Sequence, residues 1–179
     1  DPIITHLNTI QDYTCYWFIS LMDYHQYTGD VGFLSELYED AKGLMQFCLN
    51  RVDSRGFMNA QPGEWVFVDW APIDNRGDVA VIQLLFARAL EAMAEVAGVT
   101  GHPADAAYYR ACHQQALDSC FRVFWSDQLG CFTHGPADAP DAVVTRYPNL
   151  FALLFGYLTP AQRDSGIRTV LLSDTVQPI

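Results

Sequence analysis

The sequence predicts an all-α fold made of helical hairpins, and three observations predict it. Apolar residues recur at three- and four-residue steps over long stretches, which is helical periodicity. Tight links of the Thr-Gly or Thr-Pro type join these stretches in pairs. The breaks between them also recur at a nearly constant separation, which indicates an internal repeat.

The composition limits the classes of partner. The 179 residues include 21 acidic and 10 basic side chains, so the formal net charge of -11 would repel a polyanion such as nucleic acid. No apolar run approaches the roughly 20 residues that cross a bilayer, and no signal pattern opens the chain. We therefore expect neither a nucleic-acid nor a membrane partner, while the cellular location stays open.

The first predicted hairpin starts with a helix over residues 9–28. It ends at Thr28-Gly29, and Asp30 is placed to cap the next helix. The spacing in the first helix is carried by Ile10, Tyr13, Trp17, Phe18, Leu21, Met22 and His25. The second helix has the clearest amphipathic stripe of the chain, formed by Phe33, Leu34, Leu37, Tyr38, Ala41, Leu44, Met45, Cys48, Leu49 and Val52.

Two further helical pairs follow. Residues 53–57 have the composition of a turn. The segment from there to residue 78 has too many Pro, Gly and Asn residues for a helix, so we expect a loop with short strands. Residues 79–97 are apolar on nearly every face, which predicts a buried helix that Asp78 is placed to cap. An amphipathic helix over 103–124, a short apolar helix over 149–157 and an amphipathic one after Thr159-Pro160 complete the set.

The repeat predicts the architecture. Thr28-Gly29 matches Thr100-Gly101 at a separation of 72, and the turn from Asp53 to Gly56 matches that from Asp127 to Gly130 at 74. Short links make consecutive helices antiparallel, so every long loop falls on the same face. We expect apolar helices inside and amphipathic ones outside, as roughly half of an (α/α)6 toroid. Residues 1–179 would form a single partial domain of about three hairpins.

Cysteine and histidine patterns give no sign of a cofactor. The five cysteines are an odd number without CxxC spacing, which favours buried free thiols over disulfides or metal ligands. The five histidines show no metal-binding spacing, and no P-loop, nucleophile elbow or dinucleotide fingerprint is present. We therefore expect neither a metal nor another cofactor.

The loop over residues 63–78 is the strongest candidate site, because it places two Trp residues beside four acids. A sugar offers apolar C–H faces and a rim of hydroxyls, so its site needs an aromatic platform with carboxylates beside it. Asp69 and Trp70 are the best pair for this role. The alternative is that Trp70 plugs the core and Asp69 caps a turn. In residues 146–149 (RYPN), the side chain of Arg146, Tyr147 or Asn149 could contact a ligand. The alternative is that these residues only cap the start of the following helix.

Short motifs resemble a known family. Residues 65–70 (WVFVDW), followed by a buried helix, resemble the Asp-Trp loop of bacterial α-L-rhamnosidase catalytic domains. Residues 24–30 (YHQYTGD) look like the first hairpin link of that family, and residues 149–156 (NLFALLFG) resemble one of its later inner helices. The likeness covers nearly the whole chain.

The resemblance implies a function. Such an (α/α)6 domain cleaves terminal α-L-rhamnose with inversion, using a Glu acid and a Glu base. By this resemblance both catalytic residues lie outside residues 1–179, so we expect an internal fragment that is inactive by itself. The resemblance implies a substrate-binding role for Asp69 and Trp70. It implies the same role, less strongly, for the nearby Trp65 and Glu64.

Two expectations concern partners. A half toroid leaves apolar helix faces uncovered, so we expect self-association through exposed helix faces, and two copies of three hairpins would complete six. The expected ligand is a rhamnose-containing carbohydrate. The alternative is a non-catalytic helical repeat scaffold that binds protein or carbohydrate.

Overall fold

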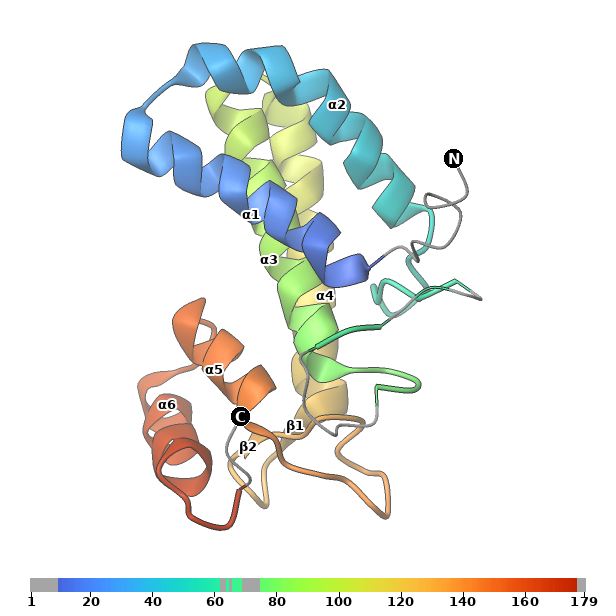
Figure 1. Ribbon diagram of the computed structural model, residues 1–179, viewed down its shortest axis with the longest axis vertical. Coiled ribbons are helices and arrows are strands. Elements are labelled where there is room, and N and C mark those ends of the chain that lie inside the picture. The colour runs from blue at the N-terminus through green and yellow to red at the C-terminus, as the bar shows by residue number, and fades with distance from the viewer. Residues whose placement is uncertain (1–9, 62–63, 65, 69–74, 177–179) are drawn as a thin grey trace, which may run out of the picture. The chain divides into compact units, whose positions relative to one another are not determined.

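The computed structural model describes residues 10–61, 64, 66–68 and 75–176. Over these residues the chain is mostly helical, with one small two-stranded sheet (Figure 1), which confirms the all-α prediction. The elements are α1 (Gln11–Thr28), α2 (Val31–Leu49), α3 (Ala80–Val99), α4 (Pro103–Phe124), β1 (Trp125–Ser126), β2 (Cys131–Phe132), α5 (Arg146–Leu154), α6 (Pro160–Gly166) and the π-helical segment η2 (Ile167–Leu171).

The chain divides into two compact units. The first contains the described residues of Asp1–Phe67 and of Leu85–Ala116, and the second contains those of Val68–Leu84 and Leu117–Ile179. Their boundaries fall inside α3 and α4. The first unit therefore holds the α1/α2 hairpin and the parts of α3 and α4 nearest their link, and the second holds the β1/β2 hairpin, α5 and α6.

The backbone repeats as the sequence predicts. Gly29 and Gly101, which end the first helix of their hairpins, have φ values of 67° and 86°. Gly56 and Gly130, which close the turns after the second helix, have φ values of 90° and 66°. Positive φ strains residues that carry a Cβ atom, so glycine at all four positions is what allows these tight reversals.

The predicted cap of α2 is confirmed. Asp30 Oδ1 accepts a hydrogen bond from the Phe33 amide at 3.0 Å, and Asp30 Oδ2 accepts one from the Tyr24 hydroxyl at 3.1 Å. These donors, the Phe33 amide first, lower the pKa of Asp30. The charged carboxylate thus satisfies an amide that the first turn of the helix leaves unpaired.

Helix α3 is buried on almost every face, as its composition predicts. The buried side chains include small alanines on several sides, which let neighbouring segments approach closely, and large apolar residues that fill the space between them. Burial of each large side chain contributes about 1.5–3 kcal/mol to stability. The buried apolar residues of α3 are Ala80, Val81, Ile82, Leu84, Leu85, Phe86, Ala87, Ala89, Leu90, Ala92, Met93, Ala94, Val96 and Ala97.

A polar cluster joins α2 to the start of α4. Asp105 Oδ2 accepts hydrogen bonds from Lys42 Nζ and from the Tyr38 hydroxyl, both at 2.6 Å. The Tyr38 ring stacks on His102 with ring centroids 3.8 Å apart. Lys42 and Tyr38, in that order, lower the pKa of Asp105. The carboxylate also lies in the first turn of α4, where the helix dipole favours a negative charge.

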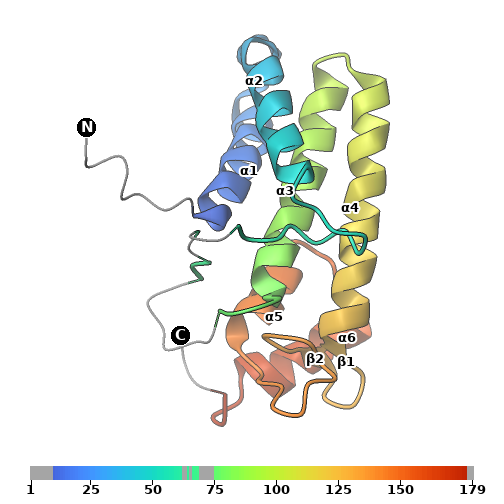
Figure 2. The same ribbon diagram turned by 90° about the vertical axis from the view of Figure 1, so that its right-hand side faces the viewer.

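In the second unit, Asn149 ties α5 to the β-hairpin. Its side-chain oxygen accepts from the Phe132 amide at 2.9 Å, while its Nδ2 donates to the Phe132 carbonyl at 2.9 Å and to the Thr145 carbonyl at 3.0 Å. The side chain thus acts as one more strand partner for β2, which pairs with β1 in antiparallel register. Figure 2 shows this hairpin beside α6.

The predicted range 149–157 for the third inner helix is shifted, because α5 runs from Arg146 to Leu154. Pro148 is compatible with the first turn of a helix, where no intrahelical amide partner is needed, so the helix starts before it. Gly156, with a φ of 72°, ends it early. The next helix was predicted after Thr159-Pro160 and starts one residue earlier, at Pro160, with a capping box between Thr159 and Gln162.

Replacing Asp105 with Asn should lower the thermal midpoint at pH 7 but not at pH 2. The folded-state pKa of Asp105 is depressed, so its stabilisation is complete above the ordinary Asp pKa of about 3.9 and is lost as the pH falls through the lower folded value. Thermal melts of Asp105→Asn and wild type at several pH values measure the difference. Asp141→Asn, in an exposed loop position, is the control. A difference that does not change with pH would contradict the assignment.

Candidate functional site

Of the four residues predicted to bind substrate, Glu64 alone belongs to the part of the chain that the structure describes. Trp65, Asp69 and Trp70 lie outside the described residues. The site is therefore built from the described segment that leads into this loop, residues 50–61 and 64, and from the elements that the segment contacts in the first unit.

Glu64 is held by two protein donors. Its Oε1 pairs with Arg51 Nη1 across side chains that are 9% and 17% exposed, respectively, and its Oε2 accepts from the Gln61 amide at 2.8 Å. The Arg51 guanidinium also lies 4.0 Å above the centre of the Phe47 ring, a cation–π contact. Arg51 lies two residues after the end of α2, so this ion pair ties Glu64 to the end of that helix.

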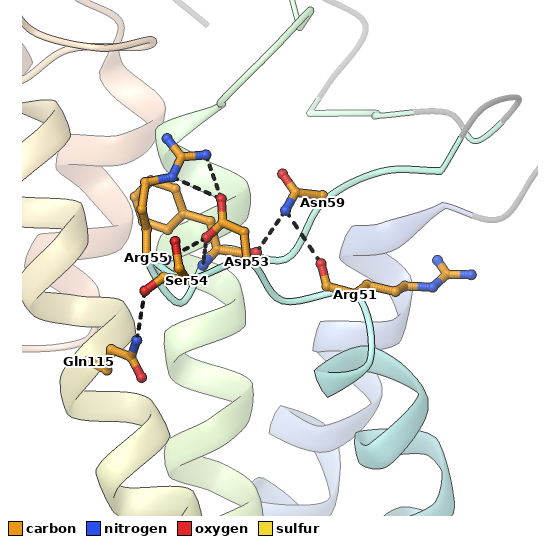
Figure 3. A network of polar contacts seen from close by, with 7 residues as sticks. Arg51, Asp53, Ser54, Arg55, Asn59 and Gln115 are labelled. Atoms are coloured by element: carbon orange, nitrogen blue, oxygen red, sulfur yellow. Dashed lines mark hydrogen bonds and ion pairs between the residues drawn. The ribbon is translucent and has the colours of Figure 1, made fainter.

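The turn from Asp53 to Phe57 is closed by a single carboxylate (Figure 3). Asp53 Oδ1 accepts from the amides of Arg55 at 2.9 Å and Phe57 at 3.2 Å, and Oδ2 accepts from Arg55 Nε at 2.8 Å and Nη2 at 2.6 Å. Burial alone would raise the pKa of Asp53, but the donors from Arg55 and Phe57 outweigh it and the net shift is downward. This turn is the Asp-x-x-Gly pattern found in the sequence.

The same turn is anchored on both sides. Gln115 Nε2 of α4 donates to the Ser54 carbonyl at 3.2 Å (Figure 3). Asn59 Nδ2 donates to the Phe57 carbonyl at 3.2 Å, and the Asn59 amide donates to the Arg51 carbonyl at 3.1 Å. The loop therefore leaves the helices in a fixed direction rather than as a free linker. Of the short strands predicted here, the described residues show one isolated bridge, between residues 52 and 58.

The first turn of α1 contains two buried polar side chains that the sequence analysis did not select. Gln11 is 4% exposed and Asp12 is 7% exposed. Burial raises the pKa of Asp12, and backbone hydrogen bonds from Tyr13 and from Asp12 itself partly offset this. The missed signal is that both residues continue, at three- and four-residue spacing, the stripe that Cys15 and Phe18 bury.

Two thiols link this turn to the candidate loop. Burial raises the pKa of Cys15, and the charges of Cys48 and Asp12 raise it further. Burial raises the pKa of Cys48 to about 11, with Arg51 lowering it and Glu64 raising it. The charge of Asp12 thus acts on Cys15 of α1, and the charges of Arg51 and Glu64 act on Cys48 of α2. All five cysteines are free, as predicted, and these two are buried.

In the second unit, the residues predicted to serve either a ligand or capping are largely occupied. All three hydrogen bonds of the Asn149 amide go to the protein itself, so its role is structural. Tyr147 is 8% exposed. Arg146 donates from Nη2 to the Ser173 carbonyl at 3.1 Å, and its Nε has no partner among the described residues.

A family comparison identifies what this domain is. The family model described as the bacterial alpha-L-rhamnosidase 6 hairpin glycosidase domain matches residues 2–176. The chain belongs to this family. The resemblance of the chain to this family is thereby confirmed, and no curated protein matches the sequence.

Two solved structures are similar to this rhamnosidase-family domain. A rhamnosidase from Klebsiella oxytoca with rhamnose bound is 25% identical with a TM-score of 0.74, covering 89% of this chain and 30% of its own. A GH78 family rhamnosidase of Bacillus sp. GL1 is 22% identical with a TM-score of 0.76, covering 88% of this chain and 17% of its own. The chain thus spans about a third or less of these relatives, and the second likeness concerns the fold alone.

The comparisons and the fold together establish a rhamnosidase-like glycoside hydrolase domain of six-hairpin type. Within residues 10–61, 64, 66–68 and 75–176, no group of three or more His, Cys, Asp or Glu side chains is arranged to hold a metal ion. In the same ranges, no helix of this rhamnosidase-family domain is long and apolar enough to span a membrane.

Replacing Gly56 with Ala should destabilise the protein by about 1–2 kcal/mol, because its φ of 90° disfavours a Cβ atom. The added atom would also lie 3.4 Å from backbone atoms of Ala116. Gly43→Ala is the matched control: Gly43 lies inside α2 with nothing within 4 Å, so Ala should stabilise by about 0.5–1 kcal/mol. Urea unfolding measures both, and effects of the same sign would contradict this account of the turn.

Proposed function

We propose that this domain contributes sugar-binding residues to a glycoside hydrolase that acts on terminal α-L-rhamnosides with inversion of configuration. The single observation that carries the proposal is the family match over residues 2–176. The similar Klebsiella oxytoca rhamnosidase, whose structure has rhamnose bound, supports carbohydrate as the ligand class. The inverting mechanism comes from the family resemblance.

The catalytic acid and base are proposed to lie outside residues 1–179, so this chain alone should not hydrolyse a glycoside. Inverting hydrolysis needs two free carboxyl groups, one to protonate the leaving group and one to activate water. Glu64 does not fit either role well, because protein donors already occupy both of its oxygens. Both oxygens of Asp53 likewise accept hydrogen bonds from the protein, within the turn that this residue closes.

Asp69 and Trp70 are proposed as the main substrate-binding pair, with Trp65 and Glu64 beside them. An indole ring offers a flat apolar surface to the C–H face of a sugar, and a carboxylate accepts hydrogen bonds from its hydroxyls. The anchored turn at Asp53 and the Arg51–Glu64 pair support this proposal, because they direct the chain into the loop from a rigid base.

Calorimetry with L-rhamnose tests the proposed pocket. The wild-type chain should bind L-rhamnose in preference to mannose and fucose, and an Asp69→Ala, Trp70→Ala double variant should lose that heat. A Tyr108→Ala, Asp138→Ala double variant, which removes an exposed aromatic and an exposed acid elsewhere, should bind as wild type does. No binding by the wild type would favour the alternative of a helical repeat scaffold without a sugar site.

Self-association of this single partial domain is the second part of the proposal. At the 72-residue separation of the repeat, Tyr13 of α1 corresponds to Leu85 of α3, and Ser20 corresponds to Ala92. Tyr13 is 64% exposed and Ser20 is exposed, whereas Leu85 and Ala92 are buried. Helix α1 therefore exposes the face that its counterpart buries, and a second copy of the chain is the proposed cover.

Light scattering after size exclusion should detect a dimer of the wild-type chain. Tyr13→Glu places a charge on the exposed face of α1, so it should weaken the dimer about tenfold or more. Tyr108→Glu, at a comparably exposed tyrosine of α4, should leave the dimer unchanged. A clean monomer of the wild type at high concentration would contradict self-association.

A further inference from the structure

Two neighbouring side chains in the first turn of α1 have buried atoms without a hydrogen-bond partner. Gln11 Nε2 and Asp12 Oδ1 find no partner among the residues that the structure describes, although more than nine-tenths of each residue is buried. A buried polar atom left unpaired costs free energy, and most proteins leave very few of them. Two on consecutive residues therefore require an explanation.

The end of the helix that carries them is also open. Ile10 occupies the N-cap position and makes no side-chain cap hydrogen bond, so the N-cap residue itself satisfies none of the first amides of α1. The helix dipole adds positive potential at the same place. The turn thus combines an amide donor, a carboxylate acceptor and backbone amides.

This turn lies near the candidate loop. Figures 1 and 2 both show the start of α1 beside the segment that follows α2, and both belong to the first unit. In the same unit, the charge of Asp12 raises the pKa of Cys15, and Glu64 raises that of Cys48. Gln11 and Asp12 are therefore on the same side of this unit as the base of the predicted sugar-binding loop.

The chemistry of the pair selects a ligand class. The Asp12 carboxylate would repel a free anion. The Gln11 amide nitrogen only donates hydrogen bonds, so it is a poor metal ligand. No metal-binding cluster lies among the described residues. Two adjacent hydroxyls fit both groups, because one hydroxyl oxygen accepts from the amide and the other hydroxyl donates to the carboxylate.

We propose that Gln11 and Asp12 bind a pair of neighbouring hydroxyls on the sugar, with Gln11 Nε2 as donor and Asp12 Oδ1 as acceptor. This inference rests on the proposed function, and it adds two binding residues from α1 to those of the loop. The unpaired atoms are then satisfied in the complex, and the protein tolerates them in the free state because the ligand needs them.

Binding of L-rhamnose, measured by calorimetry on the whole chain, is the first test. Gln11→Met and Asp12→Asn should each weaken binding about tenfold, the effect expected when one partner of a buried hydrogen bond is removed. Gln26→Met, at an exposed position in the last turn of α1, should bind as wild type does. If the wild type binds rhamnose and both first-turn variants bind equally well, the inference falls while the proposed function stands. If the wild type does not bind, both are contradicted.

Thermal unfolding without ligand is the second test, because it separates a binding role from a structural one. Gln11→Met replaces an unpaired amide with an apolar side chain of similar shape, so the midpoint should stay unchanged or rise. Asn149→Leu is the contrast: it removes an amide whose three hydrogen bonds are all made within the protein, so the midpoint should fall. A fall for Gln11→Met as large as that for Asn149→Leu would overturn the inference.

Discussion

Burial of α3 is the constraint on which the rest of this domain depends. A helix that is apolar on almost every face must be covered along its length, and its alanines allow the covering segments to approach closely. The tight link at Gly101 returns the chain at once as α4, and the equivalent link at Gly29 returns α1 as α2. Because each link is short, the long connections can only emerge at the other end of the hairpins, which is where residues that bind a ligand can vary without disturbing the core.

The base of the candidate site is held in place by contacts with the ends of these helices. The loop after α2 begins with an ion pair to Glu64, continues through a turn closed by Asp53, and is tied to α4 by Gln115. Each of these contacts uses a charged or amide side chain to satisfy the loop backbone or its neighbours, so the loop starts from a fixed base. The start of α1 lies on the same side of the unit and leaves polar atoms unpaired, which is the reverse of how the loop base is built. That contrast is the basis for assigning the Asp53 turn to structure and the α1 turn to binding.

The sequence predicted the helices and turns well, because periodic apolar residues, the Asp30 cap and glycines at positive φ are local signals. It was less successful where tertiary contacts decide. Tyr13 shares the helical spacing of α1 but is exposed, since spacing finds a helix without showing which face is covered. The clamp made by Asn149 depends on Phe132, which is distant in sequence, and helical spacing did not single out the buried Gln11. For the site, the loop was located from its Trp and acidic residues, and Asp69, Trp70 and Trp65 stay predictions because they lie outside the described residues.

We propose above all that this chain supplies part of a rhamnoside-binding site without the catalytic carboxylates. The most direct measurement is release of the chromophore from an aryl α-L-rhamnoside by the purified chain, in the same sample in which binding of the rhamnoside is recorded. We expect the chain to bind the rhamnoside without releasing the chromophore above the uncatalysed rate. Release that tracks the concentration of the chain would contradict it, because an acid and a base would then have to lie within residues 1–179.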